Sequence, residues 1–196
     1  MKDFKTFVNE NILVPRNIKG RKDKLKQLNI RLLSQEVIDG DLEIDESFMD
    51  IDPKFVKLKK VNGNVRLSGR EWTEIPAWLK DVEITKNFGC SYNKLSTLIN
   101  YPQVIGGSFY CGHNQLISLE GCPKTIQGHF VCSHNQLKSL EGGPKNIILD
   151  FSCSNNQLTS LEGCPENVGG IFWCYENKVK LELPKNVNLK SNFVNS

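Results

Sequence analysis

The feature that most constrains this chain is a 21-residue repeat that runs from Ile105 to Asn177. Cysteine and asparagine both recur at that spacing, at Cys90, Cys111, Cys132, Cys153 and Cys174 and at Asn93, Asn114, Asn135, Asn156 and Asn177. A fixed period of this size is typical of a solenoid, in which each unit forms one coil and stacks on its neighbours. The repeat therefore predicts an architecture, although it does not identify what the surface binds.

Each unit predicts one strand followed by a tight return. Apolar or small residues alternate with others from Ile126 to Cys132, which is the pattern of a strand with one buried face. We expect successive strands to pair in parallel at about 4.8 Å. Equivalent phenylalanines then form one column through the core: Phe109, Phe130, Phe151 and Phe172. Leu137 and Leu140 turn the corner, and a Gly- and Pro-containing turn returns the chain.

The repeated asparagines and cysteines are expected to be structural. A side-chain amide can donate and accept hydrogen bonds at a corner that would otherwise bury unpaired backbone groups. Five of the seven cysteines occupy one strand position, and neighbouring parallel strands orient Cβ atoms poorly for a disulfide. We therefore expect reduced, buried thiols that pack as small apolar side chains.

The pattern predicts one continuous domain, with a helical cap over residues 1–36 and a solenoid over residues 37–196. Leucines at helical spacing from Arg21 to Gln35 form an amphipathic helix that would shield the first coil. Two irregular coils of 23 residues start at Ile38 and Val61. The last coil is expected to be shortened by two residues before a terminal capping strand that contains Phe193. In all we expect about seven coils of 21–23 residues, mainly β, with one parallel strand each.

Composition argues against several classes of function. The net charge of +3 is too small to indicate a nucleic-acid partner. No apolar run is long enough to cross a bilayer, and the first residues are too charged for a secretory signal. The sequence therefore predicts a cytoplasmic protein with no membrane partner. Its oligomeric state does not follow from the sequence.

No catalytic or metal-binding motif is recognisable. The chain has no phosphate-binding loop, no HExxH and no nucleophile motif, so we predict no enzyme and no cofactor. His113 and His134 hold the same position in adjacent coils, and His129 lies on the same expected sheet. Three imidazoles could hold Zn²⁺, but no carboxylate or outward cysteine completes the set, and we predict no metal site.

The pattern Phe130-x-Cys132-x-x-Asn135-x-Leu137-x-x-Leu140 resembles the leucine-rich repeat, with Phe and Cys at two of the usual leucine positions. The unit is also similar to short bacterial leucine-rich repeats, and more closely to uncharacterised repeat proteins of large tailed bacteriophages. It departs from the usual motif by one residue between the turn and the Phe. The resemblance implies a leucine-rich-repeat-like solenoid of phage origin, located in the host cytoplasm or in the virion.

The first ten residues leave two interpretations open. Met1–Glu10 resembles the short segments that address proteins into the proheads of T-even-like phages, where cleavage follows a Glu, and Glu10 is the matching position. This resemblance implies the alternative function, a structural or capsid-packaged phage protein. The other interpretation is an N-terminal helix, with Phe4, Phe7 and Val8 on one face, that covers the end of the solenoid.

The outward positions of the strand face are the predicted binding surface. We name three rows along the stack. The capping row holds Asn87, Ser108, His129, Asp150 and Ile171; the strand row holds Gly89, Tyr110, Val131, Ser152 and Trp173; the turn row holds Tyr92, His113, His134, Asn155 and Glu176. Exposed aromatic residues with little charge are typical of protein-binding surfaces. The sequence therefore predicts a non-enzymatic interaction module that binds a host or phage protein through Tyr92, Tyr110, His113, His129, His134 and Trp173. Trp173 could instead only cover the last coil.

Overall fold

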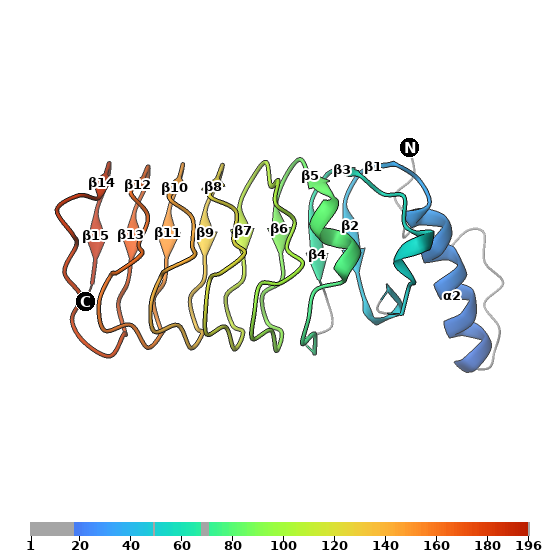
Figure 1. Ribbon diagram of the computed structural model, residues 1–196, viewed down its shortest axis with the longest axis horizontal. Coiled ribbons are helices and arrows are strands. Elements are labelled where there is room, and N and C mark those ends of the chain that lie inside the picture. Colours follow the sequence, from blue (N-terminus) through green and yellow to red (C-terminus); the bar gives the residue numbers. More distant parts are fainter. Residues whose placement is uncertain (1–17, 49, 68–70, 196) are drawn as a thin grey trace.

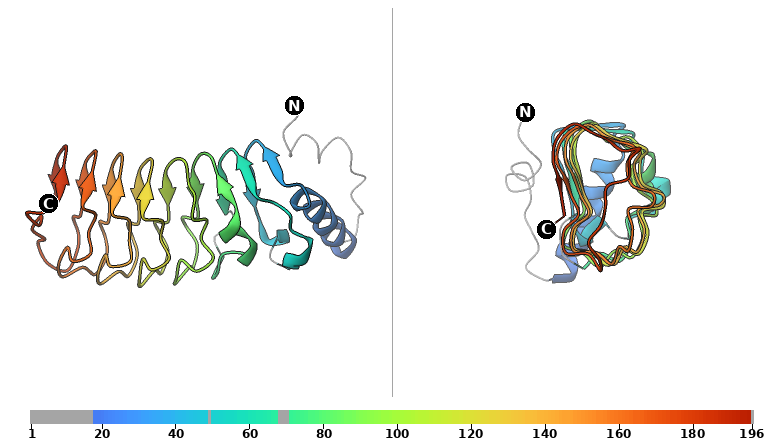
Figure 2. Two further views of the ribbon diagram at one scale, coloured as in Figure 1. Left: turned by 45° about the horizontal axis from the view of Figure 1, so that its top comes forward. Right: turned by 90° about the vertical axis from the view of Figure 1, so that its left-hand side faces the viewer.

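The computed structural model describes residues 18–48, 50–67 and 71–195, which form a parallel β-solenoid of about seven coils with one α-helix at its N-terminal end (Figure 1). Viewed along the long axis, the coils lie over one another (Figure 2). This confirms the predicted architecture. The segment 1–10 lies outside the described residues, so both interpretations of it stay predictions.

The strands form three parallel sheets. The longest sheet contains, in spatial order, β15 (Phe193–Val194), β13 (Phe172–Trp173), β11 (Phe151–Ser152), β9 (Phe130–Val131), β7 (Phe109–Tyr110), β6 (Phe88–Gly89), β4 (Val65–Leu67) and β2 (Leu42–Ile44). A second sheet contains β14 (Asn188–Leu189), β12 (Asn167–Val168), β10 (Asn146–Ile147) and β8 (Thr125–Ile126), and a third contains β1 (Val37–Asp39), β3 (Lys60–Asn62) and β5 (Glu83–Ile84).

The single strand expected in each coil is in most coils two short segments separated by a bend. In one repeat, β8 ends at Ile126 and β9 begins at Phe130. The bend between them interrupts the backbone pairing of the coils. There the amide of His129 donates to the side-chain oxygen of Ser108 at 3.0 Å, whereas the amide of Phe130 again reaches a backbone carbonyl, that of Asp150. The alternation of buried residues continues through the bend, which is why the sequence pattern indicated one longer strand.

The core column of phenylalanines is present as predicted. Ring centroids are 5.2 Å apart between Phe109 and Phe130, 5.6 Å between Phe130 and Phe151, and 4.7 Å between Phe151 and Phe172. The strands pair at offsets of 21 residues here, as in Phe130↔Phe151. Because identical rings lie over one another in register, each coil completes the core of the next.

The asparagine ladder joins the coils through their backbones. The Nδ2 of Asn135 donates to the carbonyl oxygens of Cys132 (3.0 Å) and Ser133 (3.3 Å) in its own coil and of Cys111 (3.1 Å) in the previous coil. Its Oδ1 accepts the amide of Leu116 at 2.9 Å. Asn114 and Asn156 make the equivalent contacts. The predicted structural role is therefore confirmed, and one side chain satisfies groups in two coils.

All seven cysteines are free and buried, as predicted. Burial raises the pKa of the Cys90 and Cys174 thiols to about 12, so both stay protonated near neutral pH. Tyr101 occupies the place that Cys122 holds one coil later, and its ring lies 4.4 Å from that of Phe109 while its hydroxyl lies 3.3 Å from Cys90 Sγ. These thiols serve as packing groups.

The early coils contain the predicted 23 residues, as the pairs Ile38↔Val61 and Val61↔Ile84 show. They also contain three short 3₁₀ helices, η1 (Glu46–Phe48), η2 (Pro53–Phe55) and η3 (Ala77–Asp81), at their corners. Trp72, Ile75 and Trp78 are buried there, as expected for residues that replace the corner leucines.

The two ends of the stack are closed by different devices. Helix α2 (Ile18–Leu33) buries Leu33 against the core, and the carbonyl of Leu33 accepts the amides of Lys57 and Leu58. At the other end β15 pairs with β13 at the full offset of 21 residues (Phe172↔Phe193), so the expected shortening by two residues is wrong for the strands. The side chain of Asn195 bonds both the amide and the carbonyl of Leu181, which lets a shorter return turn rejoin the register.

Replacement of Asn135 by alanine should lower the free energy of unfolding by about 3 kcal/mol, because it leaves several buried backbone groups unpaired. Gln136→Ala, at the exposed neighbouring position, should change it by less than about 0.5 kcal/mol. Urea unfolding followed by circular dichroism measures both. Equal effects of the two substitutions would show that the ladder does not stabilise the stack.

Candidate functional site

The turn row follows directly after the strands and places its side chains in solvent. Tyr92, His113, His134, Asn155 and Glu176 all have a left-handed backbone, with φ between 52° and 61°. This conformation directs each amide to the next coil; for example, the amide of His113 donates to the carbonyl of Ser133 at 3.0 Å. The conformation is therefore a requirement of the turn, whichever residue occupies the position.

Three of these side chains form an exposed stack. The ring centroids of Tyr92 and His113 are 4.2 Å apart with an interplanar angle of 9°, and those of His113 and His134 are 4.1 Å apart at 13°. Tyr92 is 56 % exposed. The predicted proximity of His113 and His134 is confirmed, and the structure adds Tyr92 to the same stack.

The stack influences how His113 titrates. Partial burial between its neighbours lowers the pKa of His113, and the charge that His134 acquires on protonation lowers it further. His113 is consequently neutral near pH 7, and the stack at that position carries no charge.

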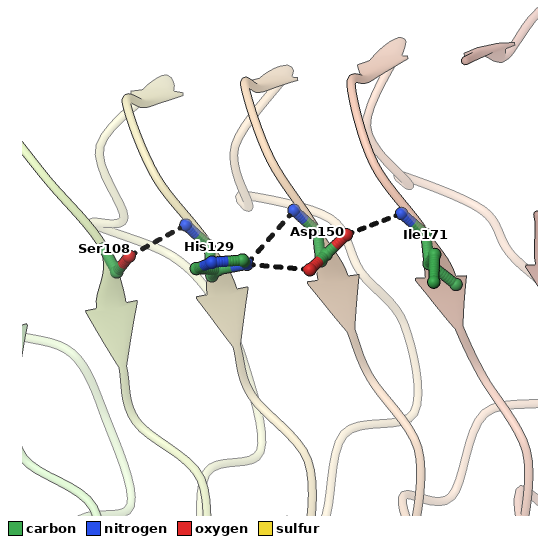
Figure 3. A network of polar contacts seen from close by, with 4 residues as sticks. All are labelled: Ser108, His129, Asp150 and Ile171. Atoms are coloured by element: carbon green, nitrogen blue, oxygen red, sulfur yellow. Dashed lines mark hydrogen bonds and ion pairs between the residues drawn. The ribbon is translucent and has the colours of Figure 1, made fainter. Parts of the chain in front are cut away.

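His129 belongs to a different arrangement, the capping row (Figure 3). Its Nδ1 lies 2.9 Å from Asp150 Oδ2, and Asp150 Oδ1 accepts the amide of Ile171 at 2.7 Å. Asn87 accepts the amide of Ser108 in the same way at 2.7 Å. Each side chain of the row thus accepts a backbone amide that the bend in the next coil leaves without a carbonyl partner.

Ser108, His129 and Asp150 are the residue types of a hydrolytic triad, but their contacts differ from those of one. A nucleophilic serine must contact the imidazole that accepts its proton. Here the Ser108 Oγ accepts a hydrogen bond from the backbone amide of His129, and Ser108 is only 6 % exposed. The row acts as a backbone cap. Sequence reasoning missed Ser108 and Asp150 as partners of His129, although short acceptor side chains recur at this position.

Tyr110 and Trp173 lie on the strand row and are half-buried. Val131 and Ser152 separate them, because the strands pair Tyr110↔Val131, Val131↔Ser152 and Ser152↔Trp173. Three strand spacings correspond to about 14 Å. Among the described residues neither ring contacts the turn-row stack. The six predicted residues therefore share one face but form one close cluster of three rings and three separate positions.

A hollow of about 590 Å³ opens on another side of the coils and contains none of the predicted residues. Leu98, Ile99, Tyr101 and Lys80 are among the residues that line it, where the last 23-residue coil meets the first coil of 21. The change of period was the only sequence signal for it.

Within the described part of the chain, no group of three or more His, Cys, Asp or Glu residues could hold a metal ion. The same residues contain no helix that is long and apolar enough to span a membrane. Comparisons with protein-family models, curated proteins and solved structures gave no match to this chain. The resemblance to leucine-rich-repeat and phage proteins accordingly stays a prediction.

Asp150→Ala should lower the free energy of unfolding by about 1 kcal/mol, because the amide of Ile171 loses its acceptor. Asp150→Asn keeps an acceptor oxygen, as Asn87 does in the same row, and should cost less than half as much. Urea titration of the two variants distinguishes the outcomes. If Asn were as destabilising as Ala, the charge of Asp150 rather than backbone capping would be its contribution.

The depressed pKa of His113 should make the fold less stable in mild acid. The unfolded chain binds a proton near the ordinary value of 6.5 and the folded chain only at lower pH, so stability falls as pH drops through 6.5. His113→Asn should lose less free energy of unfolding than the wild type between about pH 7.5 and about pH 5.5. Identical losses in the two proteins, measured by urea unfolding, would contradict the assignment.

Proposed function

We propose that the chain is a non-enzymatic protein-binding module whose partner docks on the strand face of the solenoid, centred on the stack of Tyr92, His113 and His134. The stack is exposed, and its rings are held in fixed positions by the backbone ladder beneath them. Rigid aromatic side chains of this kind lose little conformational entropy when a partner covers them.

The observation that carries this proposal is the residue choice at left-handed positions. A residue with a Cβ costs about 1–2 kcal/mol in this conformation, and glycine or asparagine adopts it most readily. Asn155 occupies the same position one coil after His134, so asparagine fits the turn. Ring stacking returns about 0.5–1.5 kcal/mol per pair and offsets only part of that cost. Strained positions of this kind concentrate at binding sites.

The remaining predicted residues extend the surface on both sides of the stack. Tyr110 and Trp173 offer half-buried rings on the strand row, next to the small side chains of Val131 and Ser152. His129, with its side chain 37 % exposed and its ring fixed by Asp150, contributes a polar edge. Tyr and Trp are the residue types that most often anchor protein interfaces.

The triple substitution Tyr92→Asn, His113→Asn and His134→Asn should keep the free energy of unfolding within about 1 kcal/mol of the wild type, because asparagine suits the turn. It should nevertheless abolish binding. Affinity capture from a lysate of the producing cells identifies candidate partners by mass spectrometry, and calorimetry with each purified candidate then measures the affinity. Tyr110→Ala with Trp173→Ala should weaken the same complex.

Lys124→Gln, which lies outside the three rows, serves as the control and should bind as the wild type does. A partner whose affinity is unchanged by the triple substitution and by the Tyr110 and Trp173 pair would contradict the proposed face.

A further inference from the structure

The stack continues round the corner of the coils into a patch of defined charge, which we call the corner patch: His113, His134, Gln115, Gln136 and Lys138. All five residues are exposed, and the residues between them in sequence are buried or partly buried except for Ile117. Outward residues alternate with inward ones such as Asn135 and Leu137, so each coil presents its exposed side chains in a line. The corner patch is therefore a surface two coils wide that begins at the imidazoles.

The corner patch has no carboxylate of its own. The outward residues of the coil that follows it are Asn155, Gln157 and Thr159, which are uncharged. On the other side Lys94 is paired with Glu71. The next carboxylate in the turn row is Glu176, two coils beyond His134.

The rings of the two histidines face only uncharged groups and each other. His113 is stacked between Tyr92 and His134, and His134 lies between His113 and the position of Asn155. The groups that shift the pKa of His113 are its surroundings and His134 alone. A proton taken up by either imidazole therefore has no acidic neighbour within this chain.

We propose that the corner patch binds an acidic segment of the partner protein, whose carboxylates accept hydrogen bonds from His113 and His134 in their protonated form, so that docking takes up protons. This inference rests on the proposed function, and it adds the chemistry of the partner and its regulation by pH. Lys138 supplies a permanent positive charge beside the two titratable ones.

The physical reason lies in the spacing of the rings. Two positive charges about 4 Å apart repel each other by about 1 kcal/mol even in water, which opposes double protonation of the free stack. A carboxylate placed against both rings removes that repulsion and forms charge-assisted hydrogen bonds. Glutamate stays ionised down to about pH 4.3, so affinity should rise as the pH falls towards that value.

A nucleic acid fits the corner patch less well than an acidic peptide. Phosphate backbones are bound mainly by many fixed Lys and Arg charges, and Lys138 is the one fixed charge in the corner patch. We therefore assign the corner to carboxylates and treat a nucleic acid as an outcome that the experiment separates.

The test uses a short fluorescent peptide of alternating Glu and Ser and the full chain, with fluorescence anisotropy at constant low ionic strength. Binding should be about tenfold tighter at about pH 5.5 than at about pH 7.5, the ratio that a one-unit rise of one imidazole pKa produces. His113→Asn with His134→Asn should remove this ratio, and asparagine at these turns keeps the fold. Lys138→Gln should weaken binding at both pH values and leave the ratio unchanged, while Lys124→Gln should behave as the wild type.

A pH-independent affinity, or the same pH ratio in the double His variant, would overturn the proposal. So would tighter binding of a single-stranded oligothymidylate with the same pH response, because the corner would then be a general polyanion site. If the acidic peptide fails to bind while the triple Asn variant still loses the captured partner, the docking face stands and only its acidic chemistry is refuted. Loss of neither interaction would refute both.

Discussion

The structure depends on one side-chain amide that is repeated in every regular coil. Asn114, Asn135 and Asn156 each donate to carbonyls of two coils and accept an amide from the earlier one. Such a contact is satisfied only when neighbouring coils are in register, so a slip by one residue would leave several buried groups unpaired. The phenylalanine column fills the core, but aromatic packing tolerates small shifts; the directional bonds of asparagine fix the alignment.

The same register determines what the outer surface can present. Because the turn that follows each asparagine ladder position is left-handed and hydrogen-bonded to the next coil, its side chain points outward at a fixed place. Side chains at that place lie about one strand spacing from their equivalents, close enough for Tyr92, His113 and His134 to stack. A regular scaffold thus holds an irregular set of functional groups. The capping row shows the opposite use of a surface position, since its histidine serves the backbone.

Much of the fold follows from the sequence because a repeat adds up weak signals. The phenylalanine column, the buried thiols and the 23-residue length of the early coils all follow from spacing alone. Other features depend on geometry that spacing does not encode. The bend that divides each predicted strand keeps the same alternation of buried residues, and the last coil recovers the register through Asn195 after a shorter turn. The left-handed turn was equally invisible, because Tyr and His are poor indicators of it, whereas Asn155 alone was a usable signal.

The account makes a direct demand on the amides that the asparagine ladder holds. Native-state hydrogen exchange, followed by nuclear magnetic resonance, reports the free energy needed to expose each amide. The amides of Leu116 and Leu137, whose acceptors are the Oδ1 atoms of Asn135 and Asn156, should exchange as slowly as the strand amides of Phe109 and Phe130 and open with them in one cooperative unit. Exchange of the two leucine amides at the rate of exposed turn amides would show that the ladder does not hold the coils in register.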